Sequence, residues 1–419
     1  MEATVNDLAD VARRAARSLV ATSAENRSLA LKTIASALED NVEFILQENL
    51  IDMERSRASG VTTGMQDRLL LTAERIHSMA KGVVAVSALP NPLGKVLHER
   101  TLENGLHLKQ VTVPFGVVGM VYEARPNVTV DAAAILLKSG NAALLRGSSS
   151  AINSNQALIQ VMRDALASTE ISPDVIQNIP AHDRATVGAL LHARGKVDLV
   201  IPRGSAELIR RVVDDSTVPT IETGAGVCHV YVDQYADLEK ALSILINSKT
   251  DRPSVCNAAE TLLVHKKVAE NFLPRALKRL HDEGVQLFTD LKTQEIAESI
   301  NVSVSLATEE NWSTEYNALV MNVAVVDSLV AASDHISKYG THHTEAIVTE
   351  DTDSAHHFIA LSDCAAVMVN ASTRFTDGEQ MGFGAEIGIS NQKLHARGPM
   401  GLEQMVTTTW IVWGAGQIR

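Results

Sequence analysis

The chain has 419 residues and a net charge of −13, with 45% hydrophobic and 21% charged residues. This length exceeds one ordinary hydrophobic core, so we expect two or three globular domains. The acidic charge and an aromatic content of only 4% argue against a nucleic-acid partner, because phosphate backbones need cations and single strands need stacking platforms.

The three cysteines, Cys228, Cys256 and Cys364, show no C-x-x-C spacing. An odd number of scattered cysteines fits a reducing compartment better than a disulfide framework. The first residues form a charged amphipathic run rather than a secretory signal, and no apolar run approaches the roughly 18 residues of a membrane span. We therefore expect a cytoplasmic protein with no membrane partner.

The chain opens with helical patterns and then changes period. Apolar spacing and capping residues predict helices over residues 7–20, from Thr22 or Ser23 to about 38, from about 42, and over 66–86. A hairpin follows, because strand-like segments 96–103 and 106–113 flank Asn104-Gly105. The β-branched segment 406–412 could pair with it. Such a flap often packs on another subunit, and an ordinary surface ribbon is equally compatible with the sequence.

Strand and helix patterns alternate after the hairpin. Strands are predicted at 115–122, 142–145, 197–201 and 218–221, with helices at 129–138, 149–166 and 205–213. A second run predicts strands at 261–264, 285–288, 318–326 and 346–349. This alternation predicts α/β parallel, doubly wound sheets, which bind ligands at the carboxyl ends of their strands. Three loops there, 123–127, 146–149 and 202–205, lead into helix starts that favour anions.

Cys256 is the candidate nucleophile. It lies in D-R-P-S-V-C-N-A-A-E at residues 251–260, between a Pro-containing loop and a predicted strand. The thiolate is the reactive form, and Arg252 could favour its negative charge. The alternative is a small buried hydrophobic residue, as most cysteines outside disulfides are.

Several common motifs are absent from the sequence. There is no G-x-G-x-x-G dinucleotide fingerprint, no P-loop and no H-E-x-x-H. The pairs His342-His343 and His356-His357 lack a metal-ligand pattern, so we expect no bound metal.

Longer segments carry a family resemblance. They are 121–129, 137–142, the cysteine segment and, most specifically, G-A-E-I-G-I-S at 384–390 with Q-K-L-H-A-R-G-P-M-G-L at 392–402. Through them the chain resembles the gamma-glutamyl phosphate reductase family of the aldehyde dehydrogenase superfamily. Met381 stands where that family often has Phe, which is a mild apolar exchange.

The resemblance implies an aldehyde-dehydrogenase-like α/β fold, with two Rossmann-like parallel-sheet domains and a small β-ribbon for oligomerisation. It implies a nucleotide-binding domain over 1–95 and 114–226, a catalytic domain over 227–400, and a ribbon built from 96–113 with 401–419. A homo-oligomer is then expected.

The resemblance also implies site residues. Cys256 falls at the family's nucleophile and Asn127 at the amide donor of the oxyanion hole. NADPH or NADP is the implied cofactor, and its expected contacts are Arg146, Gly147, Ser148, Arg203, Gly204, Ser205 and Glu345. Arg146 falls at a ribose-holding lysine of many relatives, and with Ser148 it could meet the 2′-phosphate. Gly204 and Ser205 match a turn under the pyrophosphate, and Glu345 lies near the place for the nicotinamide ribose.

The implied activity is the NADPH-dependent reduction of L-glutamyl 5-phosphate to L-glutamate 5-semialdehyde through a cysteine thioester. This step belongs to proline biosynthesis, with glutamate 5-kinase as the pathway neighbour. The substrate is anionic, and Arg125 and Arg252 are the cations nearest in sequence to Asn127 and Cys256.

Two alternative functions remain open. A hydrolytic NAD-dependent aldehyde dehydrogenase would use Glu222 as its base, whereas a reductase of an acyl phosphate must not hydrolyse its thioester, so we leave Glu222 out of the catalytic set. A non-catalytic nucleotide-binding protein that kept the fold would not need Cys256 and Asn127 together.

Overall fold

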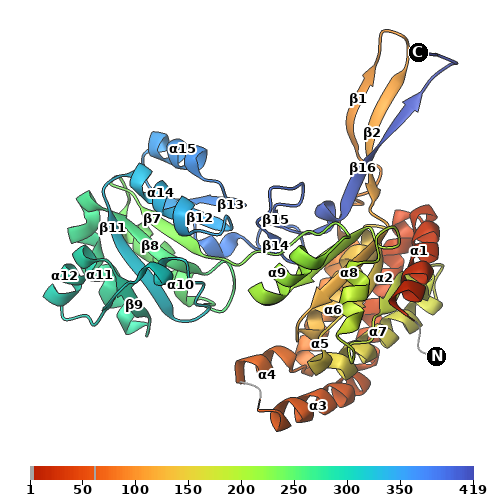
Figure 1. Ribbon diagram of the computed structural model, residues 1–419, viewed down its shortest axis with the longest axis horizontal. Helices are drawn as coiled ribbons and strands as arrows, with labels where there is room; N and C mark the ends of the chain where they lie inside the picture. The colour runs from red at the N-terminus through yellow and green to blue at the C-terminus, as the bar shows by residue number, and fades with distance from the viewer. Residues whose placement is uncertain (1–3, 61–62) are drawn as a thin grey trace. The chain divides into compact units, whose positions relative to one another are not determined.

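The computed structural model describes residues 4–60 and 63–419, and its contacts divide the chain into two compact units (Figure 1). Unit 1 runs to Thr223 and also contains Gly382–Gly388 and Met400–Arg419. Unit 2 consists of Gly224–Met381 and Ile389–Pro399. None of the described helices is long and apolar enough to cross a membrane.

The first helices of unit 1 begin at side-chain caps. Ser23 accepts the N–H of Asn26 and starts the second helix, as the sequence predicted. The helix predicted over 66–86 is interrupted, because Thr72 accepts the N–H of Arg75 and starts a new helix there. The helices are α1 (Val5–Ala21), α2 (Ala24–Asp40), α3 (Val42–Ala58), α4 (Thr63–Leu69) and α5 (Ala73–Ala88).

A four-stranded parallel sheet forms the centre of unit 1, in the order β5-β4-β3-β6. Its strands are β3 (Val117–Tyr122), β4 (Ala142–Arg146), β5 (Ile176–Asn178) and β6 (Leu199–Arg203). The helices and short 3₁₀ turns that follow them are α6 (Pro126–Lys138), η1 (Ser149–Ala151), α7 (Ile152–Ala167), η2 (Pro173–Val175), α8 (Ala185–Leu191) and α9 (Ala206–Asp215). The predicted parallel α/β sheet is confirmed.

The prediction of a strand over residues 218–221 is wrong. Only an isolated bridge between Val200 and Thr220 forms there. Pro219 accepts the N–H of Val200, and the N–H of Ile221 donates to the carbonyl of Val200. Because Pro219 has no N–H of its own, the hydrogen-bond ladder beside β6 does not continue.

The strand order places a reversal between β3 and β6, where the loops at their carboxyl ends meet. The N–H of Glu123, just after β3, donates to the carbonyl of Arg203 at the end of β6 (3.1 Å). Ligands of open α/β sheets bind at such a reversal. Two of the three loops predicted to bind anions therefore lie together.

Unit 2 contains a seven-stranded parallel sheet in the order β10-β9-β11-β8-β7-β12-β13. The strands are β7 (Cys228–Val232), β8 (Ala259–His265), β9 (Gln286–Thr289), β10 (Ser305–Leu306), β11 (Val320–Val326), β12 (Thr344–Val348) and β13 (Ala366–Val369). The helices and turn are α10 (Leu238–Thr250), α11 (Lys266–Asp282), α12 (Leu291–Ser299), α13 (Glu309–Trp312), α14 (Leu329–Tyr339), α15 (Thr352–Leu361) and η3 (Thr373–Phe375). A short pair, β14 (Ile389–Ser390) and β15 (Gly398–Pro399), completes the unit.

Separate hydrophobic clusters cover the two faces of this sheet. One contains Val230, Leu262 and Phe272 with α10 and α11, and the other contains Tyr231, Leu263 and Phe358 with α14 and α15. Because successive residues of β7 and β8 alternate between these clusters, both strands are apolar throughout and are buried on both faces.

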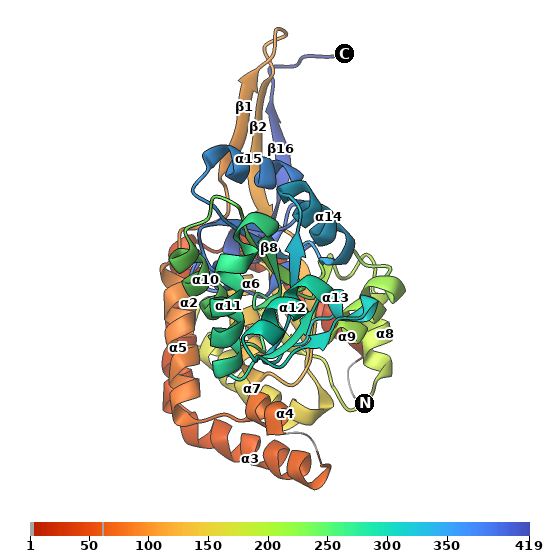
Figure 2. The same ribbon diagram turned by 90° about the vertical axis from the view of Figure 1, so that its left-hand side faces the viewer.

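The predicted pairing of the hairpin with the end of the chain is confirmed. β1 (Val96–Thr101), β2 (His107–Pro114) and β16 (Val406–Trp413) form one antiparallel sheet, shown as neighbouring strands in Figure 2. The short helix η4 (Leu402–Met405) leads into β16. The hairpin loop is longer than a two-residue Asn-Gly turn, because the N–H of Leu102 donates to Leu106 and Gly105 adopts a left-handed φ of 82°.

Candidate active site

Cys256 lies at the amino-terminal edge of the sheet of unit 2, in the loop that enters β8. Cys228 begins β7 at the same edge, and Thr344 begins β12. Ligands of parallel α/β sheets were expected at the carboxyl ends of the strands, and that rule does not predict the position of the cysteine loop. Cys256 is partly exposed and is not in a disulfide, whereas Cys228 is buried.

Gly226 and Cys228 pack closely against the backbone of Cys256. A Cβ added to Gly226 would lie 1.5 Å from the carbonyl oxygen of Cys256, so only glycine permits this approach. The Cys228 thiol donates to the same oxygen at 3.2 Å. Burial raises the pKa of Cys228 well above its usual value, so this thiol keeps its proton and remains a donor. The two cysteines thus have different roles in the fold.

Arg374 joins the two ends of the cysteine loop. Its Nε donates to Asp251 Oδ2 at 3.1 Å, and its Nη1 donates to Asn257 Oδ1. The amide of Asn257 in turn donates to the carbonyl of Thr376 at 2.9 Å. No local signal in the sequence indicates this role of Arg374, because it follows Asn257 by 117 residues.

A buried ion pair lies on the elements that flank the loop. Lys249 Nζ is 2.6 Å from Glu260 Oε2, and both side chains have no exposed area. Burial lowers the pKa of Lys249 and raises that of Glu260 to about 7, while each partner's charge opposes these shifts. Glu260 also accepts the N–H of Asn317, so this buried carboxyl group has two partners.

Replacing Lys249 with methionine should lower the free energy of unfolding by about 3–5 kcal/mol, because it leaves Glu260 buried without its counter-ion. Denaturant unfolding followed by circular dichroism measures this. The double variant Lys249→Met/Glu260→Leu is the matched control and should recover most of the loss. A single variant as stable as the parent would show that the pair does not support the loop.

Two glutamates lie near this edge in different surroundings. Glu345 on β12 is only 1% exposed, and its Oε2 accepts from the N–H and Nδ1 of His229 at 3.0 and 2.9 Å. Burial raises the pKa of Glu345. Glu315 is partly exposed, and its Oε1 accepts the N–H of Gly226, the residue packed on Cys256, at 2.6 Å. Sequence reasoning missed Glu315.

In unit 1, Asn127 lies in the first turn of α6, after Arg125 and Pro126. Its side chain is exposed, and its Nδ2 donates to Asp131 Oδ2 at 3.2 Å. Burial raises the pKa of Asp131 to about 6, although this hydrogen bond and the charge of Arg203 lower it. Asp131, one turn along the helix, thus orients the amide of Asn127.

The predicted residue Arg146 ends β4, and Gly147 and Ser148 begin the loop that follows it. Arg146 is only 8% exposed, and its guanidinium donates to the carbonyls of Gly147, Ala181 and Asp183. A Cβ on Gly147 would lie 2.1 Å from Asn155 Nδ2, so the backbone passes too close to α7 for any side chain. In this structure Arg146 therefore shapes the loop from inside.

Arg203 ends β6, and Gly204 and Ser205 lead from it into α9. Glu123 crosses from the neighbouring loop, and its carboxylate accepts the N–H of Ser205 at 3.0 Å and its hydroxyl at 2.6 Å. A Cβ on Gly204 would lie 2.7 Å from Glu123 Cδ. A carboxylate therefore occupies the donors predicted for a pyrophosphate.

The predicted residues fall into two groups. Arg125, Asn127 and the loops after β4 and β6 belong to unit 1, whereas Cys256, Arg252 and Glu345 belong to unit 2. Arg252 is exposed on the cysteine loop. Their roles toward substrate and cofactor stay predictions.

Comparison with known proteins matches the profile of the aldehyde dehydrogenase family to residues 1–293. The chain is 53% identical over 419 residues to the gamma-glutamyl phosphate reductase of Thermobifida fusca, covering 100% of this chain and 99% of that one. It is 50% identical over 418 residues to that of Caldicellulosiruptor bescii, covering 99% and 100% of the two chains. The chain belongs to the gamma-glutamyl phosphate reductase family.

The family assignment makes the protein an oxidoreductase of the aldehyde dehydrogenase group, as the resemblance implied. A solved gamma-glutamyl phosphate reductase from Thermotoga maritima has a TM-score of 0.95 with 45% identity and covers 99% of each chain. An acetylating aldehyde dehydrogenase from Geobacillus thermoglucosidasius, with 16% identity and a TM-score of 0.69, shares the fold. Aldehyde dehydrogenases use a nicotinamide cofactor, so this enzyme is expected to bind one.

Proposed function

We propose that this enzyme reduces L-glutamyl 5-phosphate to L-glutamate 5-semialdehyde with NADPH and releases phosphate, in proline biosynthesis. The observation that carries the proposal is the 53% identity to a gamma-glutamyl phosphate reductase over the whole chain. Glutamate 5-kinase would supply the acyl phosphate, and the cytoplasm is the expected location. Unit 1 is proposed to bind the nucleotide and unit 2 to supply the nucleophile.

Cys256 is the proposed nucleophile. Its thiolate attacks the acyl-phosphate carbonyl, the bond to the phosphate oxygen breaks with its electron pair, and a thioester remains on the sulfur. The partial exposure of Cys256 supports this role, because a substrate must reach the sulfur. Gly226, Arg374 and Asn257 hold the loop and keep the sulfur in one place.

Asn127 is proposed to stabilise the oxyanion together with the backbone N–H of Cys256. One such donor contributes about 10²–10³ in rate. Asp131 accepts from Asn127 Nδ2, and an amide nitrogen has two hydrogens. One hydrogen therefore fixes the amide, and the other is available for the substrate.

The loops after β4 and β6 are proposed to bind a dinucleotide, because each leads from the carboxyl end of a strand to a helix start, where backbone N–H groups favour phosphate. When bound, the cofactor would supply the hydride that reduces the thioester to the aldehyde. Arg146 and Ser148 would keep the first loop in shape, and Arg203 with Ser205 would hold the phosphates. Glu123 must then release the two donors of Ser205.

Glu315 is a second candidate, beside Glu345, for the nicotinamide ribose. A ribose hydroxyl needs an accessible acceptor close to the reacting sulfur. Glu315 is partly exposed and bonded to Gly226, which packs on Cys256, whereas Glu345 is bonded to His229 in the sheet interior. Arg125 and Arg252 remain the proposed cations for the phosphate and carboxylate of the substrate.

The proposed reaction is tested in reverse, with glutamate 5-semialdehyde, phosphate and NADP. Reduced cofactor, detected by its absorbance, should form only when phosphate is present, because phosphate must cleave the thioester. The hydrolytic alternative predicts the same rate without phosphate and loss of that rate in Glu222→Gln. Phosphate-independent turnover would therefore contradict the proposed function.

A further inference from the structure

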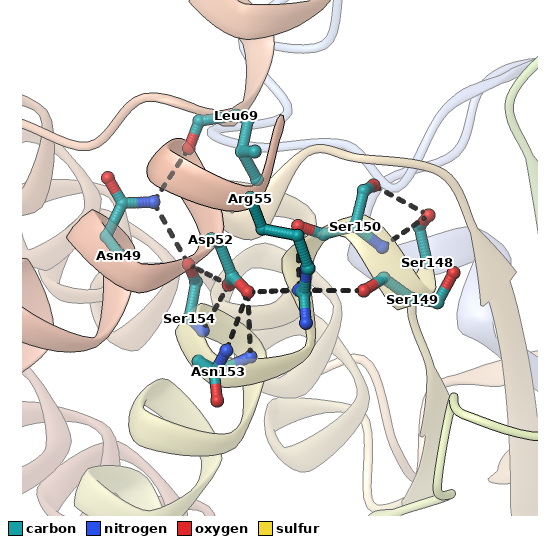
Figure 3. Close-up of polar contacts among 9 residues, drawn as sticks. All are labelled: Asn49, Asp52, Arg55, Leu69, Ser148, Ser149, Ser150, Asn153 and Ser154. Carbon is teal, nitrogen blue, oxygen red and sulfur yellow. Dashed lines mark hydrogen bonds and ion pairs between the residues drawn. The ribbon is translucent and has the colours of Figure 1, made fainter. Parts of the chain in front are cut away.

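Helix α3 supplies the cap that α7 lacks, at the loop proposed to bind the nucleotide (Figure 3). Ala151, the N-cap residue of α7, makes no side-chain cap. Asp52 of α3 is fully buried instead, and it accepts the N–H of Ser154 at 2.8 Å and its hydroxyl at 2.7 Å. Asp52 also accepts from Asn153 Nδ2 at 2.9 Å. The start of α7 is therefore fixed from outside its own chain segment.

Arg55, one turn along α3, continues this network onto the loop itself. Its Nη2 donates to Asp52 Oδ1 at 2.5 Å and to the carbonyl of Ser149 at 2.9 Å, with a longer contact to Ser150 (Figure 3). The side chain is 48% exposed, and within the described residues its Nη1 and Nε make no hydrogen bond. Both hydrogens of Nη2 are thus engaged, whereas Nη1 and Nε remain available as donors.

The other cations at this loop differ in how they are held. The guanidinium of Arg146 is buried and bonded to backbone carbonyls, so it has little capacity left for a ligand. Burial lowers the pKa of Arg146, and the nearby charge of Arg184 lowers it further. Arg184 is exposed, and no hydrogen bond among the described residues fixes its side chain. Ser149, whose carbonyl holds Arg55, exposes its side chain.

We propose that Arg55 makes this enzyme prefer NADP to NAD, by donating from Nη1 or Nε to the 2′-phosphate of the cofactor. This inference rests on the proposed function, because it places the adenosine end of the cofactor at the loop after β4. A guanidinium that is already fixed loses little freedom when it binds a phosphate, and each hydrogen bond that it donates to the phosphate is charge-assisted. NAD carries only a hydroxyl at that position.

The test uses two probes that differ only in the 2′-phosphate, adenosine 2′,5′-bisphosphate and adenosine 5′-monophosphate, titrated by calorimetry into the full-length protein. Arg55→Ala should weaken the bisphosphate by about 10- to 100-fold and leave the monophosphate within about twofold, since a charged pair is lost for one probe only. Arg55→Lys should keep part of the preference. Arg57, which is exposed on the same helix, supplies the matched control, and Arg57→Ala should change neither affinity.

Three results would overturn the inference. Equal weakening of both probes by Arg55→Ala would make Arg55 a residue that only shapes the loop. A selective loss in Arg184→Ala, with none in Arg55→Ala, would move the recognition to Arg184. A parent protein that binds both probes equally would have no preference to explain. The phosphate-dependent assay stands apart from these titrations, so a failure of the proposed reaction is recognised separately.

Discussion

Replacing Cys256 with alanine should reduce turnover by about 10⁴-fold or more and leave NADP binding within a few-fold of the parent. The thiol is proposed to form the covalent bond to the acyl group, whereas the proposed contacts of the cofactor's phosphates belong to unit 1. Steady-state assays in the reductive direction measure turnover, and calorimetry measures cofactor affinity. Mass spectrometry of the parent mixed with substrate, without cofactor, should detect the acyl group on Cys256.

Cys228→Ala and Cys364→Ala are the matched controls for this prediction. Cys228 donates to the carbonyl of Cys256 from a buried position, so its loss should cost stability and only a modest part of the rate. Burial raises the pKa of Cys364 to about 12, so its thiol is unreactive near neutral pH. Full activity in Cys256→Ala would remove the central proposal.

Removal of residues 406–419 should convert the proposed homo-oligomer into monomers or aggregates, with loss of activity as a consequence. β16 covers one edge of β2 along its whole length, from Val406 opposite Pro114 to Trp413 opposite His107. The resulting ribbon is largely exposed, with Trp413 at 66% and Trp410 at 48%. Apolar side chains on an exposed strand are typical of a surface that a second subunit covers.

Light scattering coupled to size-exclusion chromatography measures the mass of the truncated protein. The matched control removes only residues 415–419, which follow β16 and leave its pairing intact, so its mass should equal that of the parent. A chain that lacks residues 406–419 and keeps its oligomeric mass would show that the ribbon does not hold the subunits together.

Local signals made the larger part of the fold predictable. Ser23, the turn at Asn104-Gly105 and the apolar run that became β8 each carry their information within a few residues. Thr72 was missed because Leu69, Leu70 and Leu71 continue an apolar pattern across the break between α4 and α5. β7 was missed because Cys228–Val232 is short and directly follows a glycine-containing loop.

The candidate site was predictable only in part, because its supporting contacts join distant segments. Cys256 and Asn127 carry sequence motifs. Arg374 reaches Asn257 across 117 residues, and Asp52 reaches Ser154 across 102, so neither pair has a local signature. The sequence placed Arg146 at the nucleotide loop but could not show that its guanidinium would be bonded to carbonyls inside the fold.

The return of the chain to unit 1 has a consequence for the order in which the protein is made. β2 is synthesised early, but its partner β16 lies almost at the last residue. Unit 2 is inserted between them and can fold as soon as its own residues have left the ribosome. Throughout that time the β1–β2 hairpin carries an uncovered edge, which is a site for wrong pairing with other nascent chains. The proposed assembly through the ribbon must therefore follow the synthesis of β16, so a chain that ends before Val406 would be unable to assemble in this way.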